Sequence, residues 1–122
     1  MVNPRNNRDV EWMTDMLNAI EKIERYTSGV DLDGFLADDE KQDAVLRRLE
    51  ILGEATKQIS EFTRNKYPEV RWRAIAGLRD VITHQYFGLS YDKIWNVVIK
   101  DIPVLKSQLN YIFDHEIKDE PK

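Results

Sequence analysis

The sequence predicts an all-α fold, specifically an up-and-down four-helix bundle with short connections. Apolar residues return every three or four positions along four long segments, as they do in helices that are buried on one side. Glycine and proline together account for only nine of the 122 residues, and no segment shows the alternation of a strand. The length and the 42% of apolar residues fit one domain over residues 1–122, with its core at about 8–113 and a flexible tail at about 116–122.

Two helices are predicted in the first half of the chain. The first spans residues 7–27 and ends at Ser28-Gly29, where Gly29 suits a left-handed cap. A connector over residues 30–38 follows, in which Phe35 is expected to pack against the core. The second helix spans residues 39–63, with Phe62 in its apolar stripe. Gly53 inside this helix costs about 1 kcal/mol relative to alanine, so we expect a close helix crossing there.

Two further helices are predicted in the second half. One spans residues 69–83 and buries Ala74, Ile75, Leu78 and Ile82. The other begins after Ser90, which is a good N-cap residue, and carries an apolar stripe as far as residue 112. Pro103 should kink this last helix, because proline lacks the backbone N–H that an inner helical turn needs. Residues from 118 onward are expected to fray.

Composition excludes several classes of function. The chain has no cysteine, which excludes disulfides, thiolate chemistry and cysteine-based zinc sites. It has no apolar signal or membrane-spanning stretch, so we expect a cytoplasmic protein with no membrane partner. A net charge of −4 argues against broad binding to nucleic acid and against a DNA-binding regulator. A local basic cleft remains possible, since five basic residues fall within sixteen positions: Arg64, Lys66, Arg71, Arg73 and Arg79.

The segment from Arg79 to Tyr86 (RDVITHQY) carries the residues best suited to chemistry. His84 is one of only two histidines, and an imidazole takes or gives a proton near neutral pH. Arg79 is permanently charged and matches a phosphate with two parallel donors. Together they would cleave RNA without a metal, with His84 as general base toward the RNA's 2′-hydroxyl and Arg79 on the scissile phosphate. DNA lacks that nucleophile and would be inert.

The spacing of the motif sets a geometric problem. On a regular helix Arg79, Thr83 and Tyr86 lie within about 60° of one another, whereas His84 lies about 140° from Arg79. The two side chains can therefore converge in only two ways. Either the helix unwinds near His84, or a second protomer supplies the missing group across a two-fold axis.

Each of these residues also has an ordinary structural interpretation. A histidine near a helix end often caps carbonyl groups, and an arginine on a helix is usually a surface or ion-pair residue. Asp80 could simply neutralise Arg79, and Tyr86 could be a half-buried aromatic with a hydrated hydroxyl. Spacing alone leaves these interpretations open. The other histidine, His115, is expected to be inert.

The whole chain resembles the HEPN superfamily, and specifically the HepT-like toxins that are paired with a minimal nucleotidyltransferase. Arg79-x4-His84-x-Tyr86 matches the Arg-x4-His-x-Tyr motif of that family. The run RLEILGEA at residues 48–55 resembles the family's signature on its second helix. Similar residues also occur in the family at Trp72, the Ala76-Gly77-Leu78 run, Trp95 and Pro103, and the likeness covers about residues 8–113.

The resemblance implies a HEPN-like helical homodimer with a shared active-site cleft, acting as a metal-independent endoribonuclease on tRNA or mRNA. It assigns catalysis to Arg79 and His84, with no cofactor and no metal. Asp80 takes the polar position after the arginine, where a carboxylate would either orient Arg79 or His84 or weaken phosphate binding. Tyr86 would be AMPylated by the partner nucleotidyltransferase, placing negative charge where the RNA phosphate must bind. The chain would thus be the toxin of a type VII toxin–antitoxin pair.

Two points complete the expectations from sequence. Glu54 belongs to the family signature yet lies opposite the apolar stripe of its helix, so we expect it to form a surface or interface salt bridge. The alternative function is a non-catalytic HEPN interaction module that dimerises and docks a nucleotidyltransferase. Loss of toxicity on His84→Ala would favour the enzyme over the module.

Overall fold

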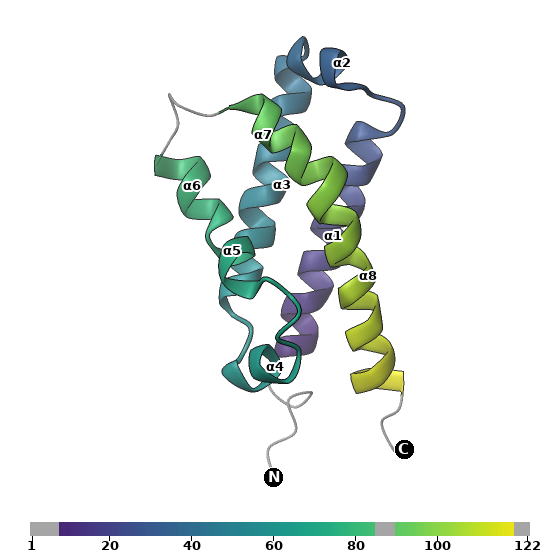
Figure 1. The fold of residues 1–122 in the computed structure, drawn as a ribbon, viewed down its shortest axis with the longest axis vertical. Coiled ribbons are helices and arrows are strands. Elements are labelled where there is room, and N and C mark those ends of the chain that lie inside the picture. The colour runs from purple at the N-terminus through teal and green to yellow at the C-terminus, as the bar shows by residue number, and fades with distance from the viewer. Residues whose placement is uncertain (1–7, 85–89, 119–122) are drawn as a thin grey trace.

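The computed structural model describes residues 8–84 and 90–118, which form a bundle of four antiparallel helical columns (Figure 1). The first column is α1 (Asp9–Thr27) and the second is α3 (Asp39–Lys57), and these two pack together along their length. The third contains α5 (Trp72–Ala76) and α6 (Leu78–His84). The fourth contains α7 (Tyr91–Asn96) and α8 (Ile102–Phe113). The all-α fold predicted from the sequence is therefore confirmed.

The connector between the first two columns folds as the sequence predicts. Gly29 has a φ of +74°, the left-handed conformation that ends α1. The short helix α2 (Leu32–Leu36) follows, and its N-cap residue Asp31 accepts a hydrogen bond of 2.8 Å from the Gly34 amide. Phe35 is fully buried, with its ring centroid 5.1 Å from that of Trp95 on α7. The connector therefore closes one end of the bundle.

The prediction of one helix over residues 39–63 is wrong beyond Lys57. The chain turns at Gln58 and re-enters a helix as α4 (Glu61–Lys66), with Ser60 as its N-cap. The Arg64 guanidinium donates to the carbonyls of Thr56 at 2.9 Å and Ile59 at 3.1 Å, which satisfies the exposed end of α3. Because α4 leaves the direction of α3, Phe62 is 47% exposed instead of lying in the stripe.

The helix predicted at residues 69–83 is two short helices joined at Gly77. Residues 67–71 form turns, and α5 begins only at Trp72, whose indole Nε1 donates to the Tyr67 carbonyl at 2.9 Å. Of the residues expected to be buried, Ile82 is buried, Ile75 and Leu78 are partly buried and Ala74 is exposed. The helix α6 continues through His84.

The last column bends without breaking. Ser90 caps α7 as predicted, accepting from the Lys93 amide at 3.4 Å. The predicted kink at Pro103 takes the form of a π-helical turn over Val97–Asp101, in which the Ile102 amide donates to the Val97 carbonyl. This wider turn changes the hydrogen-bond register just before Pro103, which occupies the first turn of α8, where no N–H is needed.

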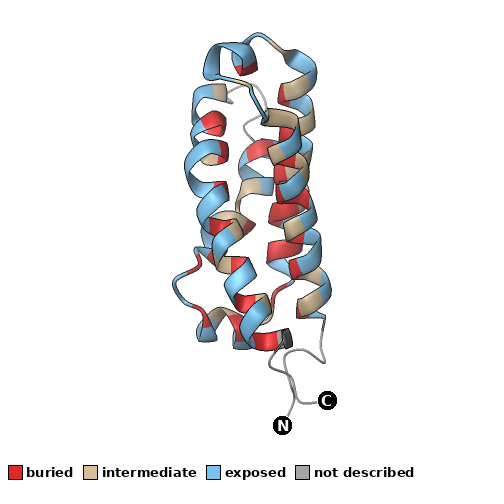
Figure 2. Cartoon of the chain, turned by 90° about the vertical axis from the view of Figure 1, so that its right-hand side faces the viewer, coloured by how far each residue is buried: buried red, intermediate tan, exposed pale blue. Residues whose placement is uncertain are grey.

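The core lies along the bundle axis, with buried residues turned inward from all four columns (Figure 2). The fully buried side chains include Met16, Ile20, Leu49, Leu109 and Ile112. Burying a side chain of this size stabilises the fold by about 1.5–3 kcal/mol. None of the helices described is both long and apolar enough to cross a bilayer.

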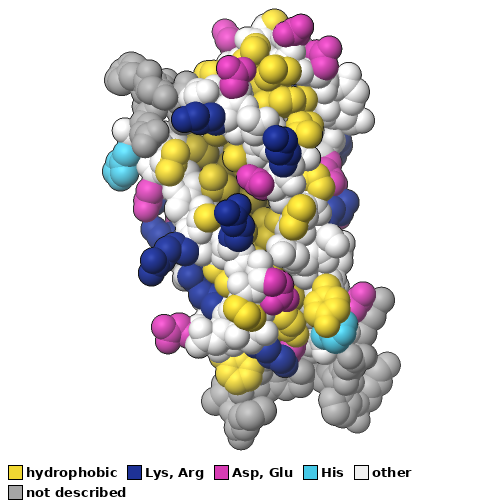
Figure 3. Space-filling view, viewed as in Figure 1, with side chains coloured by type: hydrophobic (Ala, Val, Ile, Leu, Met, Phe, Trp, Pro, Cys, Tyr) yellow, Lys and Arg dark blue, Asp and Glu magenta, His cyan; other side chains and the backbone are white. Residues whose placement is uncertain are grey.

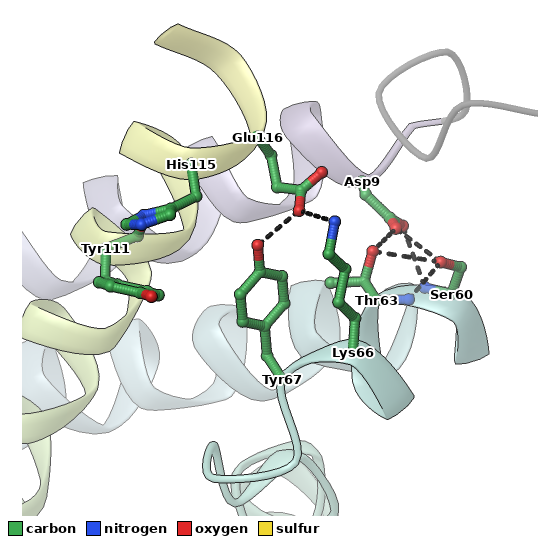
Figure 4. A network of polar contacts seen from close by, with 8 residues as sticks. All are labelled: Asp9, Ser60, Thr63, Lys66, Tyr67, Tyr111, His115 and Glu116. Atoms are coloured by element: carbon green, nitrogen blue, oxygen red, sulfur yellow. Dashed lines mark hydrogen bonds and ion pairs between the residues drawn. The ribbon is translucent and has the colours of Figure 1, made fainter. Parts of the chain in front are cut away.

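Two polar networks hold α4 between the first and last columns (Figure 4). On one side the buried Asp9 carboxylate accepts from the Ser60 amide at 3.0 Å, the Ser60 hydroxyl at 2.6 Å and the Thr63 hydroxyl at 2.5 Å. On the other side buried Glu116 accepts from the Tyr67 hydroxyl and pairs with Lys66 Nζ at 2.5 Å.

The second network has two consequences. Burial raises the pKa of the Tyr67 hydroxyl, and its bond to the Glu116 carboxylate raises the pKa further. Glu116 lies in a second π-helical turn, Asp114–Lys118, so the tail predicted to be flexible from residue 116 is held at that residue. Residues 119–122 lie outside the described part of the chain.

Candidate functional site

Gly53 positions the helix that carries the motif. A Cβ atom added at Gly53 would lie 3.0 Å from the Arg79 amide nitrogen and 3.1 Å from the Ile75 carbonyl oxygen. Only glycine therefore allows α3 to approach the junction of α5 and α6 this closely. The predicted close crossing is confirmed, and it lies directly at the backbone of Arg79.

The Arg79 side chain is held by acidic neighbours at the surface. Its Nε lies 3.1 Å from Glu54 Oε2, and its Nη1 lies 3.9 Å from Asp80 Oδ1. Asp80 in turn lies 4.0 Å from Lys57 Nζ. The Arg79 side chain is 46% exposed, so these ion pairs orient the guanidinium without removing it from solvent. Because it stays half exposed, the guanidinium remains accessible to a phosphate.

These contacts can be compared with the roles expected for Glu54 and Asp80. Glu54 forms the surface salt bridge expected of it, and its partner is Arg79 of the candidate site. Asp80 lies beside Arg79, as the neutralising interpretation requires, but its carboxylate is divided between Arg79 and Lys57 at nearly equal distances.

His84 lies at the other end of the same helix and is exposed. Because α6 is helical from Leu78 through His84, the five residue steps from Arg79 to His84 rotate the side chains about 140° apart and separate them by about 7.5 Å along the axis. The helix does not unwind between Arg79 and His84, and residues 85–89, which follow His84, lie outside the described part of the chain. One chain therefore does not aim Arg79 and His84 at a single point.

A hollowed face runs beside the motif between α1, α3 and α6. One pocket of about 300 Å³ contains Arg79 and Glu54. A second pocket of about 450 Å³ contains Thr83, Ile82 and Tyr91. Arg47 and Glu50 line both pockets, so the two form one continuous face. Arg79 and Thr83 share this face, as their spacing predicts.

This face is mixed in charge. The pocket around Arg79 contains Arg47 as a second guanidinium and three carboxylates: Asp15, Glu50 and Glu54. In a single chain these carboxylates oppose the approach of RNA, so binding a phosphate there requires additional positive charge. Sequence reasoning missed Arg47 and Glu50, although polar residues at 43, 47, 50 and 54 repeat at helical spacing and mark the outer stripe of α3.

Three further points concern metal binding and the remaining residues singled out from the sequence. Within residues 8–84 and 90–118, no three histidine, aspartate or glutamate side chains are grouped so that they could hold a metal ion. Tyr86, the predicted modification site, lies outside the described residues. His115, which we expect to be inert, stacks on Tyr111 with ring centroids 3.8 Å apart.

The helical bundle and the Arg-x4-His motif on one of its helices define the class of HEPN domains. A more specific comparison gives the family. The family model described as "Ribonuclease HepT-like" matches residues 16–112, which is most of the chain. The chain therefore belongs to the HepT-like ribonuclease family.

Individual relatives agree with this assignment. The chain is 41% identical over 110 residues to "Putative RNase MJ0127" of Methanocaldococcus jannaschii, covering 89% of this chain and 91% of that protein. It is 40% identical over 104 residues to "Probable ribonuclease HepT" of Thermococcus cleftensis, covering 85% and 93%. It is 35% identical over 105 residues to "Putative RNase TTE0752" of Caldanaerobacter subterraneus, covering 86% and 94%. No solved structure matches the chain.

Proposed function

We propose that this protein is a metal-independent endoribonuclease toxin that acts in the cytoplasm as a homodimer. The observation that carries the proposal is the Arg79-x4-His84 pair on α6 of a chain that belongs to a ribonuclease family. Both side chains are exposed, so a polynucleotide can reach them, and Arg79 lines a hollowed face. The proposed substrate is tRNA or mRNA.

The proposed reaction uses the substrate's own 2′-hydroxyl as nucleophile. His84 accepts the proton of that hydroxyl while its oxygen attacks the adjacent phosphorus. The bond from phosphorus to the 5′-oxygen breaks, and this oxygen takes a proton from water. Arg79 binds the non-bridging oxygens and stabilises the charge that develops on them. The products are a 2′,3′-cyclic phosphate and a 5′-hydroxyl.

The geometry of α6 supports a site built from two chains. Since Arg79 and His84 point about 140° apart on a regular helix, a two-fold axis beside α6 would bring Arg79 of one protomer toward His84 of the other. Neither side chain would then need to leave its position on the helix.

Tyr86 is the proposed point of control. Its hydroxyl oxygen would attack the α-phosphate of ATP bound to the partner nucleotidyltransferase, releasing pyrophosphate and leaving AMP on the tyrosine. The new phosphate would lie two residues beyond His84 in sequence and would exclude RNA by charge and occupancy. We expect Tyr86→Phe to retain cleavage but to escape the partner, whereas AMP addition to this variant at the wild-type level would refute Tyr86 as the acceptor.

The test is RNA cleavage in EDTA by protein whose intact mass shows Tyr86 to be unmodified. Wild type should cut, leaving cyclic phosphate ends, and His84→Ala should not. His115→Ala is the matched control, because it removes the other histidine and should cut as wild type does. Equal cleavage by His84→Ala would contradict the mechanism. Binding of the nucleotidyltransferase without any cleavage by unmodified wild type would favour the non-catalytic interaction module.

A further inference from the structure

Three arginines surround an open pocket on the turn that leads into α5. The pocket has a volume of about 560 Å³, and it is lined by Arg64, Arg71, Arg73 and, between them, Pro68, Val70 and Trp72. Lys and Arg side chains gather along the same edge of the molecule, beside α5 (Figure 3). The motif residues Arg79 and His84 do not line this pocket.

Two of these arginines carry charge that the described part of the chain does not neutralise. Arg71 and Arg73 are exposed, and no carboxylate of residues 8–84 or 90–118 forms an ion pair with either of them. Arg79 and Lys66, by contrast, are paired with Glu54 and Glu116. What distinguishes Arg71 and Arg73 from the other basic residues that form no ion pair within the described part of the chain is that they line one pocket together with a third arginine, Arg64.

Hydrogen bonds and burial hold the residues around this pocket in place. Arg64 uses Nε and Nη2 to bind the Ile59 and Thr56 carbonyls, so its guanidinium is fixed at the end of α3. Trp72 is 5% exposed and is anchored by its bond to the Tyr67 carbonyl. The two polar networks on α4 hold the segment between these residues from both sides (Figure 4). The arginines are therefore presented by a fixed turn.

We propose that this arginine pocket, formed by Arg64, Arg71 and Arg73, is a second phosphate site that binds the RNA backbone outside the cleavage centre. This proposal rests on the proposed ribonuclease function. Guanidinium groups match phosphate oxygens with paired donors, so three arginines around one pocket suit an RNA backbone. Six residue steps separate Arg73 from Arg79, so their Cα atoms lie at most about 22 Å apart, a distance that a short single strand can span.

A second phosphate site would compensate for the negative charge around Arg79 at the cleavage centre. The pocket around Arg79 contains three carboxylates, so the phosphate at that position is held against local repulsion. A second site on the same chain that contributes positive charge would retain the strand while Arg79 acts on one phosphate. Affinity for a longer RNA would then depend on Arg71 and Arg73, whereas cleavage of a dinucleotide would not.

The test compares RNA binding by two double variants, each in a His84→Ala background so that the RNA stays intact. Arg71→Gln/Arg73→Gln removes both unpaired charges, and neither side chain makes an interaction on which the fold depends. Arg25→Gln/Lys100→Gln removes two charges from exposed positions outside the pocket and is the matched control. Fluorescence anisotropy gives the Kd of a labelled single-stranded RNA at several salt concentrations, and circular dichroism checks that both variants fold.

We expect the pocket variant to raise the Kd at least tenfold. The slope of log K against log salt should become shallower by about 0.7 for each RNA phosphate that the variant no longer neutralises. With His84 restored, the KM for a long RNA should rise while cleavage of a dinucleotide stays at the wild-type rate. A Kd and slope equal to those of the control variant would overturn the proposal. Unchanged RNA binding with loss of nucleotidyltransferase binding would show that the pocket takes an acidic protein surface instead.

These results can be told apart from a failure of the ribonuclease proposal. If wild type does not cut RNA but still binds it through Arg71 and Arg73, the second phosphate site stands and the catalytic assignment falls. If wild type cuts RNA and the pocket variant behaves like the control, catalysis stands and the phosphate site falls. If wild type does not bind RNA, the phosphate site is refuted as well.

Discussion

Replacing Gly53 with alanine would disturb the one close approach that places the motif helix against α3. The new Cβ would lie 3.0 Å from the Arg79 amide nitrogen and 3.1 Å from the Ile75 carbonyl oxygen. Both are backbone atoms, which cannot rotate away as a side chain would. The junction of α5 and α6 must therefore shift by a few tenths of an ångström.

The magnitude follows from two opposing terms. Overpacking of a tight contact typically costs about 1–3 kcal/mol. Alanine is a better helix former than glycine by about 1 kcal/mol, which offsets part of this cost. We expect a net loss of about 0–2 kcal/mol, with the upper half of this range favoured because the clash is with backbone. A loss of about 1–2 kcal/mol would lower Tm by roughly 3–12 °C for a chain of this size. Cleavage should fall as well, since Arg79 moves with the junction.

A second glycine provides the control. A Cβ at Gly77 would lie 3.4 Å from the Arg73 carbonyl oxygen and 3.5 Å from that of Ala74, which are ordinary contacts. Its φ of −74° suits any residue, so Gly77→Ala should unfold at or above the wild-type temperature. Thermal unfolding followed by circular dichroism compares the two variants. If Gly53→Ala matched the stability and cleavage rate of Gly77→Ala, the close approach would have no role in placing the motif.

Three further substitutions test other parts of the structure. The folded protein holds the Tyr67 proton more tightly than the unfolded chain does, so this stabilisation is complete below about pH 10 and is lost as pH rises further. Between about pH 9 and 11, the free energy of unfolding measured in urea should therefore fall less for Tyr67→Phe than for wild type. Asp9→Asn should lower the free energy of unfolding by about 1–3 kcal/mol, because an amide cannot accept from all the donors at the start of α4; a change below the error of urea unfolding would refute this role. Glu54→Gln should change the free energy of unfolding by less than about 1 kcal/mol, because its ion pair with Arg79 is half exposed. The rate of RNA cleavage should nevertheless drop by roughly tenfold, because one charge-assisted hydrogen bond to Arg79 is removed. Cleavage kinetics equal to those of wild type would show that Glu54 does not orient Arg79.

Local pattern was sufficient to predict the columns of the bundle, but not their interruptions. The apolar period through Ile59 and Phe62 predicts a continuous helix, whereas Ser60 begins a new one. That break depends on Asp9, which lies 51 residues away and binds the Ser60 amide and hydroxyl. A pattern read along the chain cannot show a partner at that distance.

The candidate site shows the same division. The spacing of Arg79 and His84 and the angle of about 140° between them follow from the sequence, because both depend only on helix geometry. The salt bridge of Glu54 could be expected from its position outside the apolar stripe, but its partner depends on how α3 and α6 cross at Gly53. That Arg71 and Arg73 have no acidic partner among the described residues could not be predicted either, since it depends on which basic residues find acidic partners in the fold.

The central claim is that Arg79 of one protomer acts with His84 of the other, and mixing two inactive variants tests it directly. Arg79→Ala and His84→Ala should each fail to cut RNA in EDTA. After exchange of subunits, a dimer that contains one chain of each kind regains one intact site, so the mixture should recover about a quarter of the wild-type activity. A mixture that stays inactive, although subunit exchange is shown by mass spectrometry, would contradict the shared site.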